Sequence, residues 1–330
     1  MNQKATCAWE KWSGHDALRL TGFGYETLLV PDLGANTVQL TYREGNTLLN
    51  ILRNPGSDRD LLLNPYEYGV PVLFPPNRLS GAGYSWDGVD YRFPVNSPGQ
   101  MHIHGVLHGR PWPVADCGAD EHKAWARLAL DTDKDAALRS HFPVPMEIVL
   151  EIELTKDGLG HRFTVNNNGD RHEIPVALAY HTAFSVAFGG DAGSVRLHVP
   201  IEQRGVGHAD TMLPTGQFQA LDGYEKQIAS EEGADPLLKE FDGIFLASTD
   251  DHEAVLRDRD TGWEVVYRAD PVHRYWLIWN KTAEDGFVCV EPQTWLSNAI
   301  NSPDPVERHT AFVPPRGSWS TLCTIGARKR

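Results

Sequence analysis

The chain has 330 residues, of which 41% are hydrophobic, and it carries a formal net charge of −14 at pH 7. A charge of this sign argues against nucleic acid or an anionic membrane surface as a partner, because both attract basic patches. No stretch approaches the ~20 apolar residues of a membrane span, and the first ten residues lack the apolar core of a signal peptide. We therefore expect a cytoplasmic protein with no membrane partner.

The four cysteines, Cys7, Cys117, Cys289 and Cys323, lie far apart in the sequence. None of their spacings is typical of a zinc site, and a chain of this length does not need a disulfide framework. We expect four buried thiols. The ten tryptophans and thirty glycines indicate a β-rich chain with many loops, in which most indole rings belong to the core.

Residues 15–50 alternate between apolar and polar positions and contain turn sequences, which predicts short strands joined by turns. An apolar run over residues 71–76 then ends in two prolines and is followed by Asn77 and Arg78. The guanidinium group of Arg78 presents several donors in a fixed fork, so it is a candidate for holding ligand oxygens. The alternative is an arginine paired with a surface carboxylate.

Three histidines, His102, His104 and His108, fall close together in the next segment. A metal site is one interpretation, because His102 and His104 would share a face of a strand. No carboxylate occurs between His104 and Asp116, so we predict no metal. A second interpretation is ligand recognition or proton transfer by one ring, and a third is structural hydrogen bonding, which we expect for His102 and His108. Trp112 offers a flat platform for a sugar ring.

Residues 146–155 alternate strictly between apolar residues and glutamates. This pattern predicts an antiparallel strand with one buried and one solvated face. The apolar face would carry Ile148, Leu150, Ile152 and Leu154. Glu147, Glu151 and Glu153 would then form a solvated face and not a catalytic cluster.

His181 is the one histidine in a nearly continuous apolar run over residues 174–186. Burying a histidine is costly unless it is hydrogen-bonded. His181 is therefore either a satisfied core residue or an acid whose pKa is tuned by burial.

A second apolar run, Phe287–Val290, is closed by Glu291 and Pro292. Proline cannot donate a ladder hydrogen bond, so we expect the strand to end there and to leave Glu291 at the rim of an apolar sheet. Burial raises the pKa of a carboxylate in such a place, which suits a general base. The alternative is a strand-end glutamate in solvent or in a structural hydrogen bond.

Short strands continue to the C-terminus, and the sequence has no long helical periods, internal repeats or linkers. We therefore predict one all-β domain over residues 1–330.

The order and spacing of several stretches over residues 70–295 resemble those of the aldose 1-epimerase (galactose mutarotase) family. The matching stretches are Asn77-Arg78-Leu79, Gly88–Tyr91, Asn96 with His104-Gly105, Tyr180-His181 with Phe184, Leu213–Gly216, Asp242, and Glu291-Pro292-Gln293. Each stretch is unspecific alone, but together they cover most of the chain. The resemblance implies a large antiparallel β-sandwich of one domain.

The resemblance also implies roles for individual residues. Glu291 would be the general base and His181 the general acid. The expected substrate-binding residues are Asn77, Arg78, His104, Trp112, Asp242 and Gln293. No metal and no cofactor is implied. The sequence departs from the galactose-specific pattern at Val106 and directly after His181, which leaves the identity of the sugar open.

The activity that follows is interconversion of the α and β anomers of an aldohexose by acid–base ring opening and reclosure. The expected partner is a small sugar, either neutral or substituted with phosphate or sulfonate, and the chain would act as a monomer or homodimer. Two alternatives stay open. One is a glycoside hydrolase that uses Asp242 and Glu291 as its carboxylate pair, and the other is a sandwich protein that binds sugar or regulates without catalysis.

Overall fold

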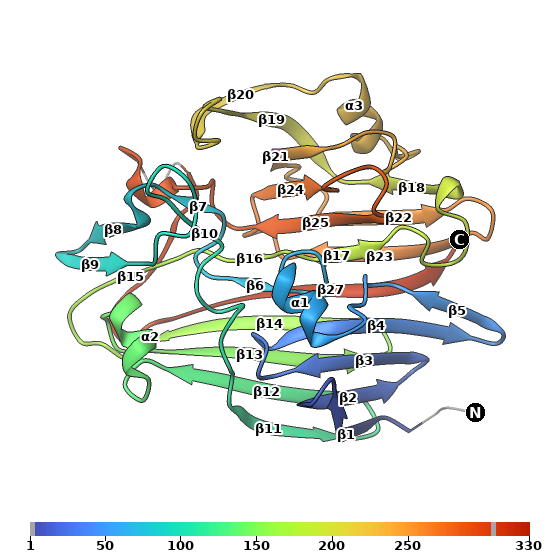
Figure 1. The fold of residues 1–330 in the computed structure, drawn as a ribbon, viewed down its shortest axis with the longest axis horizontal. Coiled ribbons are helices and arrows are strands. Elements are labelled where there is room, and N and C mark those ends of the chain that lie inside the picture. The colour runs from blue at the N-terminus through green and yellow to red at the C-terminus, as the bar shows by residue number, and fades with distance from the viewer. Residues whose placement is uncertain (1–3, 305–307) are drawn as a thin grey trace.

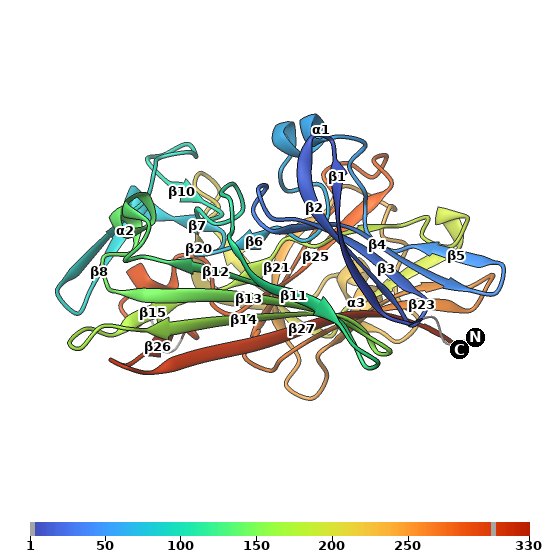
Figure 2. The same cartoon turned by 90° about the horizontal axis from the view of Figure 1, so that it is seen from below.

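Antiparallel β-sheet is the main secondary structure of the protein and helices are few, in agreement with the all-β prediction. The computed structural model describes residues 4–304 and 308–330. Within these residues the chain forms two eight-stranded sheets, one five-stranded sheet and three two-stranded ribbons. The sheets stack as layers of a sandwich, which Figure 2 shows edge-on for the five-stranded sheet and the strands beneath it.

One eight-stranded sheet forms the back layer in the view of Figure 1. Its strands follow the spatial order β11 (Val114–Ala119), β12 (Ala124–Asp131), β13 (Met146–Thr155), β14 (Gly158–Asn167), β27 (Ser318–Lys329), β23 (Trp263–Ala269), β22 (Glu253–Asp258) and β18 (Val195–His198). The five-stranded sheet covers one end of it and consists of β1 (Thr6–Trp12), β2 (His15–Gly22), β3 (Tyr25–Val30), β4 (Asn36–Glu44) and β5 (Thr47–Asn50).

The second eight-stranded sheet covers the other end. Its strands are β20 (Pro214–Ala220), β19 (Ile201–Gly207), β21 (Asp242–Ala247), β24 (Tyr275–Trp279), β25 (Phe287–Gln293), β16 (Ala179–Tyr180) and β6 (Val72–Leu73), with β17 (Ala183–Ser185) also paired to β25. The ribbons are β7 (Arg78–Leu79) with β10 (His102–Ile103), β8 (Gly83–Trp86) with β9 (Val89–Arg92), and β15 (Ile174–Val176) with β26 (Ala311–Val313).

The two eight-stranded sheets pack face to face through aromatic rings. The ring of Tyr267 in β23 lies 6.0 Å from Trp276 in β24 and 5.5 Å from Phe184 in β17, between centroids. Its hydroxyl is 3.0 Å from the hydroxyl of Thr182. The three rings belong to one hydrophobic core that also contains Leu150 of β13, so the two layers share a continuous interior.

The alternating strand at residues 146–155 is confirmed as β13. The side chains of Ile148, Leu150, Ile152 and Leu154 are buried. The glutamates lie on the opposite face, where Glu153 pairs with Lys123 and Glu151 with Arg127. Exposed ion pairs of this kind add little stability, which fits a solvated face.

The strand that carries Glu291 runs further than the sequence predicted. We expected it to end at Pro292, but β25 continues to Gln293, and all of its residues are buried. On one side β25 pairs with β24, and Trp276 lies opposite Pro292.

Pro292 interrupts the ladder on the other side of β25 instead. The amides of Val290 and Thr294 donate hydrogen bonds to the neighbouring segment at 3.1 and 2.9 Å, whereas Pro292 between them has no amide to donate. The neighbouring segment is therefore divided into β16 and β17, and His181 lies in the gap.

Helices are few and short in the described part of the chain. They are α1 (Asp58–Leu63), α2 (Ala136–His141) and α3 (Gly223–Ala229), with three 3₁₀ turns at Ser80–Ala82, Ala192–Ser194 and Ala299–Asn301. Among the described residues, none of these helices has the length and apolar character needed to cross a bilayer.

Candidate active site

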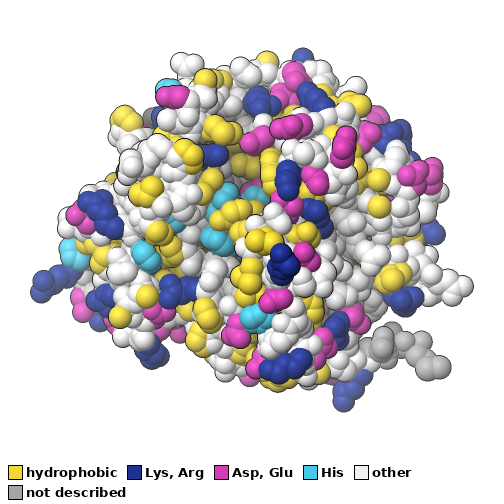
Figure 3. All heavy atoms as spheres, viewed as in Figure 1, with side chains coloured by type: hydrophobic (Ala, Val, Ile, Leu, Met, Phe, Trp, Pro, Cys, Tyr) yellow, Lys and Arg dark blue, Asp and Glu magenta, His cyan; other side chains and the backbone are white. Residues whose placement is uncertain are grey.

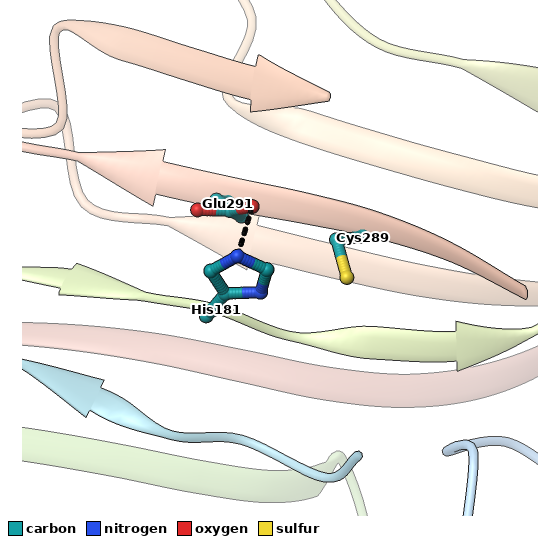
Figure 4. Close-up of side chains that lie close together, drawn as sticks. All are labelled: His181, Cys289 and Glu291. Carbon is teal, nitrogen blue, oxygen red and sulfur yellow. Dashed lines mark ion pairs between the residues drawn. The ribbon is translucent and has the colours of Figure 1, made fainter. Parts of the chain in front are cut away.

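Glu291 and His181, the two residues expected to carry out the chemistry, lie side by side. Oε1 of Glu291 is 3.1 Å from Nε2 of His181 (Figure 4). Both side chains are buried, with 1% and 5% of their surface exposed. The contact is close, but Oε1 of Glu291 and Nδ1 of His181 have no hydrogen-bond partner among the described residues. Two buried polar groups are thus left for another molecule to satisfy.

The environment acts on the two residues in opposite directions. Burial raises the pKa of Glu291 well above its usual range, and the negative charge of Asp242 raises it further. Burial lowers the pKa of His181 to about 3. Both shifts favour the uncharged form of each group, because a low-dielectric site penalises charge.

His104, which was expected to hold substrate, also reaches this pair. Its ring centroid lies 5.3 Å from that of His181 in an edge-on arrangement. His104 has φ +67°, a left-handed conformation that is uncommon for residues other than glycine. The following Gly105 has φ +68°, and a Cβ atom there would lie 2.2 Å from the carbonyl oxygen of Phe74. The backbone thus turns sharply where it delivers the His104 ring.

The left-handed turn also separates the side chains of His102 and His104. β10 ends at Ile103, so His102 and His104 do not share a strand face. The His102 ring stacks on Phe93, and its Nδ1 lies 2.7 Å from the carbonyl oxygen of Pro94. His102 is therefore hydrogen-bonded in the structure of the loop, as expected.

Arg78 and Asp242 line a pocket of about 330 Å³, together with Asn77, Arg204 and Ser297. Within the described residues, neither Arg78 nor the carboxylate of Asp242 forms an ion pair. Burial lowers the pKa of Arg78 and, although Asp242 is exposed on the pocket wall, surrounding protein raises the pKa of its carboxyl. Arg78 is therefore not the surface-paired arginine of the alternative interpretation.

Asn77 lines this pocket, and the buried Gln293 lies behind its lining residue Ser297. The Gln293 side chain donates to the carbonyl oxygen of Trp295 at 2.8 Å, and its own Oε1 has no partner among the described residues. Ser297, 3.5 Å from the Gln293 amide nitrogen, links it to the pocket. Asn77 accepts hydrogen bonds from the amides of Arg78 and His104. Asn77 thus orders the backbone that presents two predicted ligand residues.

The structure does not bring Trp112 to this site. Its ring is buried with 2% exposure, and its indole N–H donates to the carbonyl oxygen of Leu107. The nearby Arg110 pairs with Asp135. Trp112 is a core residue here, and the expected sugar platform is not formed by it.

Two aromatic residues that the sequence did not single out contact His181 instead. The ring of Tyr66 lies 5.5 Å from His181 and 4.4 Å from His104. Trp279 at the end of β24 meets His181 edge-on at 5.6 Å. Trp279 had a signal, since it ends the apolar and aromatic run of residues 275–279, which is typical of a strand. The sequence around Tyr66, over residues 54–69, has no clear period. Figure 3 shows histidine side chains in a hollow near the middle of this face, beside hydrophobic groups.

Cys289 is a third residue that the sequence did not assign to the site. It lies two positions before Glu291 on β25, so both side chains point to the same face. One ligand atom each from His181, Cys289 and Glu291 lie within 4.8 Å of one another (Figure 4). In the described part of the chain, this is the one such group of His, Cys, Asp or Glu residues.

Comparison with known proteins gives a consistent result. A sequence model of the family described as Aldose 1-epimerase matches residues 16–309. A galactose mutarotase-like protein from Clostridium acetobutylicum is 28% identical over 100% of both chains, with a TM-score of 0.91. A galactose 1-epimerase from Lactobacillus acidophilus NCFM is 14% identical over 100% of this chain and 99% of that one, with a TM-score of 0.75. A galactose mutarotase-like protein from Lactobacillus casei ATCC 334 is 17% identical over 94% and 100%, with a TM-score of 0.69. The last two likenesses show a shared fold alone.

Proposed function

We propose that this chain, which belongs to the aldose 1-epimerase family, interconverts the α and β anomers of an aldohexose by opening and reclosing the sugar ring. The observation that carries the proposal is the buried pair of Glu291 and His181, 3.1 Å apart, with polar atoms that no described residue partners. Glu291 lies in the same sheet as Asp242, and the negative charge of Asp242 raises the pKa of Glu291.

The proposed reaction requires two proton transfers between the protein and the sugar. Ring opening removes a proton from the O1 hydroxyl and delivers one to the ring oxygen O5. In the proposed mechanism the Glu291 carboxylate takes the first proton and the His181 imidazolium gives the second. Rotation about C1–C2 exposes the other face of the aldehyde, and reclosure reverses both transfers. Each positioned transfer typically contributes ~10²–10⁴-fold to the rate.

The two proton transfers change the charges of Glu291 and His181 when the ring opens. Opening converts the carboxylate and imidazolium into a carboxylic acid and a neutral imidazole, and no net proton leaves the site. Burial favours this uncharged pair for Glu291 and His181. The same burial acts before the ring opens, so the charged pair forms at a free-energy cost that ring opening relieves.

Two of the proposed sugar-holding residues act on this pair directly: the charge of Asp242 acts on Glu291, and the His104 ring lies against His181. Among the described residues, Arg78 and Asp242 offer donors and an acceptor without ion-pair partners, and Gln293 offers an unpaired amide oxygen. His104 offers a ring nitrogen that no described residue partners. A buried sugar needs partners for nearly all of its hydroxyls. Trp279 and Tyr66 would supply the apolar contacts.

Exchange NMR between the two anomeric signals tests the proposal. Glucose, galactose and their 6-phosphates would be equilibrated with the protein, and magnetisation transfer between the C1 protons would give the rate. We expect acceleration with at least one sugar and a loss of ~10²–10⁴-fold for Glu291→Gln and for His181→Asn. Glu151→Gln on the solvated face of β13 and His122→Asn on the surface are matched controls.

Absence of acceleration with every sugar, at concentrations where binding is detected, would leave a sugar-binding protein. Equal activity of wild type and Glu291→Gln would remove the acid–base pair from the mechanism.

A further inference from the structure

We propose that His181, Cys289 and Glu291 form a binding site for a thiophilic divalent cation such as Zn²⁺, and that the bound cation blocks the acid–base pair. The first half of this proposal concerns binding alone, whereas the block rests on the proposed function. Cys289 has no role in the proposed reaction, so its position beside the pair calls for a separate explanation.

The three ligands come from two neighbouring parts of one sheet. Cys289 and Glu291 are alternate residues of β25 and therefore project to the same face. His181 lies on the adjoining segment between β16 and β17, where Ala183 pairs with Cys289. The segment opens at this point because Pro292 supplies no ladder hydrogen bond. The fold thus directs a thiol, an imidazole and a carboxylate to one point.

The distances are close to those of a tetrahedral zinc site. Zinc binds sulfur at about 2.3 Å and nitrogen or oxygen at about 2.0–2.2 Å, so neighbouring ligand atoms are roughly 3.3–3.7 Å apart. The nitrogen and oxygen of His181 and Glu291 are already 3.1 Å apart. The full set lies within 4.8 Å, so contraction by roughly 1 Å completes the geometry.

The thiol of Cys289 is free to take part. Its one hydrogen-bond contact among the described residues is a weak one, 3.7 Å to the carbonyl oxygen of Tyr66. Its side chain is fully buried, and in this part of the chain the nearby Oε1 of Glu291 lacks a hydrogen-bond partner. A cation would satisfy this buried oxygen.

Three protein ligands leave one tetrahedral position open for water or a sugar hydroxyl. A cation held here coordinates the carboxylate that would accept the O1 proton and the imidazole that would protonate O5. Metal binding and anomer exchange would therefore exclude each other.

A second cysteine–histidine contact provides a matched control. Sγ of Cys323 lies 3.7 Å from Nε2 of His273 in the core. The neighbouring carboxylate of Asp270 is bonded to the amide of Leu322 and the hydroxyl of Thr321, and no third ligand among the described residues joins this pair. Cys323→Ser thus changes a buried thiol beside a histidine without changing the proposed site.

Binding is measured first, without sugar. Wild type, Cys289→Ser and Cys323→Ser are titrated with Zn²⁺ by calorimetry and with Cd²⁺ by ultraviolet absorption, because a cadmium–thiolate bond has its own charge-transfer band. Cys7 and Cys117 are half-buried and not buried as expected, and they lie on the neighbouring strands β1 and β11. Both are present in all three proteins, so they add the same signal to each. We expect a site that binds at least about 10-fold more weakly in Cys289→Ser, with a smaller band than in wild type, and is unchanged in Cys323→Ser.

An absent cadmium band in wild type, or an equal band and equal binding in Cys289→Ser, would overturn the metal site. If Cys289→Ser does not fold, as judged by circular dichroism, Cys289→Ala replaces it in the same comparison with wild type. Exchange NMR with Zn²⁺ then tests the block. Inhibition of wild type and of Cys323→Ser, relieved by EDTA and absent in Cys289→Ser, supports it, and equal inhibition of all three contradicts it.

The two proposals fail separately. A protein that binds Cd²⁺ through Cys289 but exchanges no anomers has the metal site without the proposed activity. A protein that exchanges anomers and shows no thiolate band has the activity without the metal site.

Discussion

The hydroxyl of Tyr66 lies 3.1 Å from Nε2 of His108, and this contact connects the loop after α1 to the candidate active site. Burial raises the pKa of Tyr66 to about 12 and lowers that of His108 to about 4. Tyr66 therefore donates and the neutral His108 ring accepts. The other ring nitrogen of His108 then donates to the carbonyl oxygen of His104 at 3.2 Å. His108 and Tyr66 together hold the strained residue His104 against His181.

Tyr66→Phe removes this support without removing the aromatic ring. The change leaves Nε2 of His108 without a donor, so we expect a loss of about 1 kcal/mol in the free energy of unfolding. Looser positioning of His104 should lower the anomer exchange rate by about 5-fold. Urea unfolding and exchange NMR give the two values. Tyr68→Phe on the same loop is the control, and equal effects of the two changes would show that the hydroxyl of Tyr66 has no specific role.

Arg78 lacks an ion-pair partner in the described residues. We therefore predict that it contributes to ligand binding more than to the stability of the protein. Arg78→Gln removes charge-assisted hydrogen bonds to the sugar, each worth about 2 kcal/mol, so KM should rise about 30-fold. The free energy of unfolding should stay equal or increase, because a half-buried charge is removed.

Arg110→Gln provides the comparison, because Arg110 pairs with Asp135 away from the site. This change should lower stability by up to about 1 kcal/mol and leave KM as it is. Stability loss in Arg78→Gln without a change in KM would make Arg78 a structural residue.

The sequence predicted the strands well because their burial pattern is local. The alternation over residues 146–155 appears unchanged as β13. Glu291 and His181 were recognisable as polar residues inside apolar runs, and family resemblance related them to each other. Their 3.1 Å contact depends on strand pairing between distant segments, which local patterns do not contain.

The errors have a physical cause as well. His104 and Trp112 are near in sequence, but the left-handed conformation of His104 sends its ring to the site, while Trp112 enters the core. Pro292 was expected to end its own strand and instead divides the neighbouring one. Tyr66 lies in a loop without periodicity, so only the fold brings it to the histidines.

Gly105 allows the turn that presents His104, and its replacement should damage both fold and site. A Cβ atom there would meet the Phe74 carbonyl oxygen at 2.2 Å. Gly105→Ala should therefore lower the free energy of unfolding by about 3 kcal/mol and reduce anomer exchange.

Gly81 has a similar φ of +62°, but a Cβ atom at this position would have no described atom within 4 Å. Gly81→Ala thus carries the backbone strain alone, and we expect a loss of about 1 kcal/mol with unchanged exchange. Urea unfolding of both variants separates the two effects. Equal losses would mean that the contact with Phe74 does not limit this position.

The buried His161 predicts a loss of stability on acidification. Burial lowers its pKa to about 3, whereas an unfolded histidine titrates near 6.5. The folded state favours the neutral ring, so its contribution is complete above pH 6.5 and is lost as the pH falls from 6.5 toward 3. At pH 5 the unfolded chain binds a proton at His161 and the folded protein does not. This difference lowers the free energy of unfolding by about 2 kcal/mol.

His161→Gln tests this effect while keeping a polar group opposite the Thr37 hydroxyl, which lies 3.0 Å from the His161 ring. The variant will be less stable than wild type at pH 7.5, because the core packing changes. Between pH 7.5 and pH 5 this difference should shrink by about 2 kcal/mol, since the variant lacks the titrating ring. Urea unfolding at both pH values gives the comparison, with the surface variant His122→Gln as control. A difference in stability that stays constant with pH would mean that protonation of His161 does not lower the free energy of unfolding.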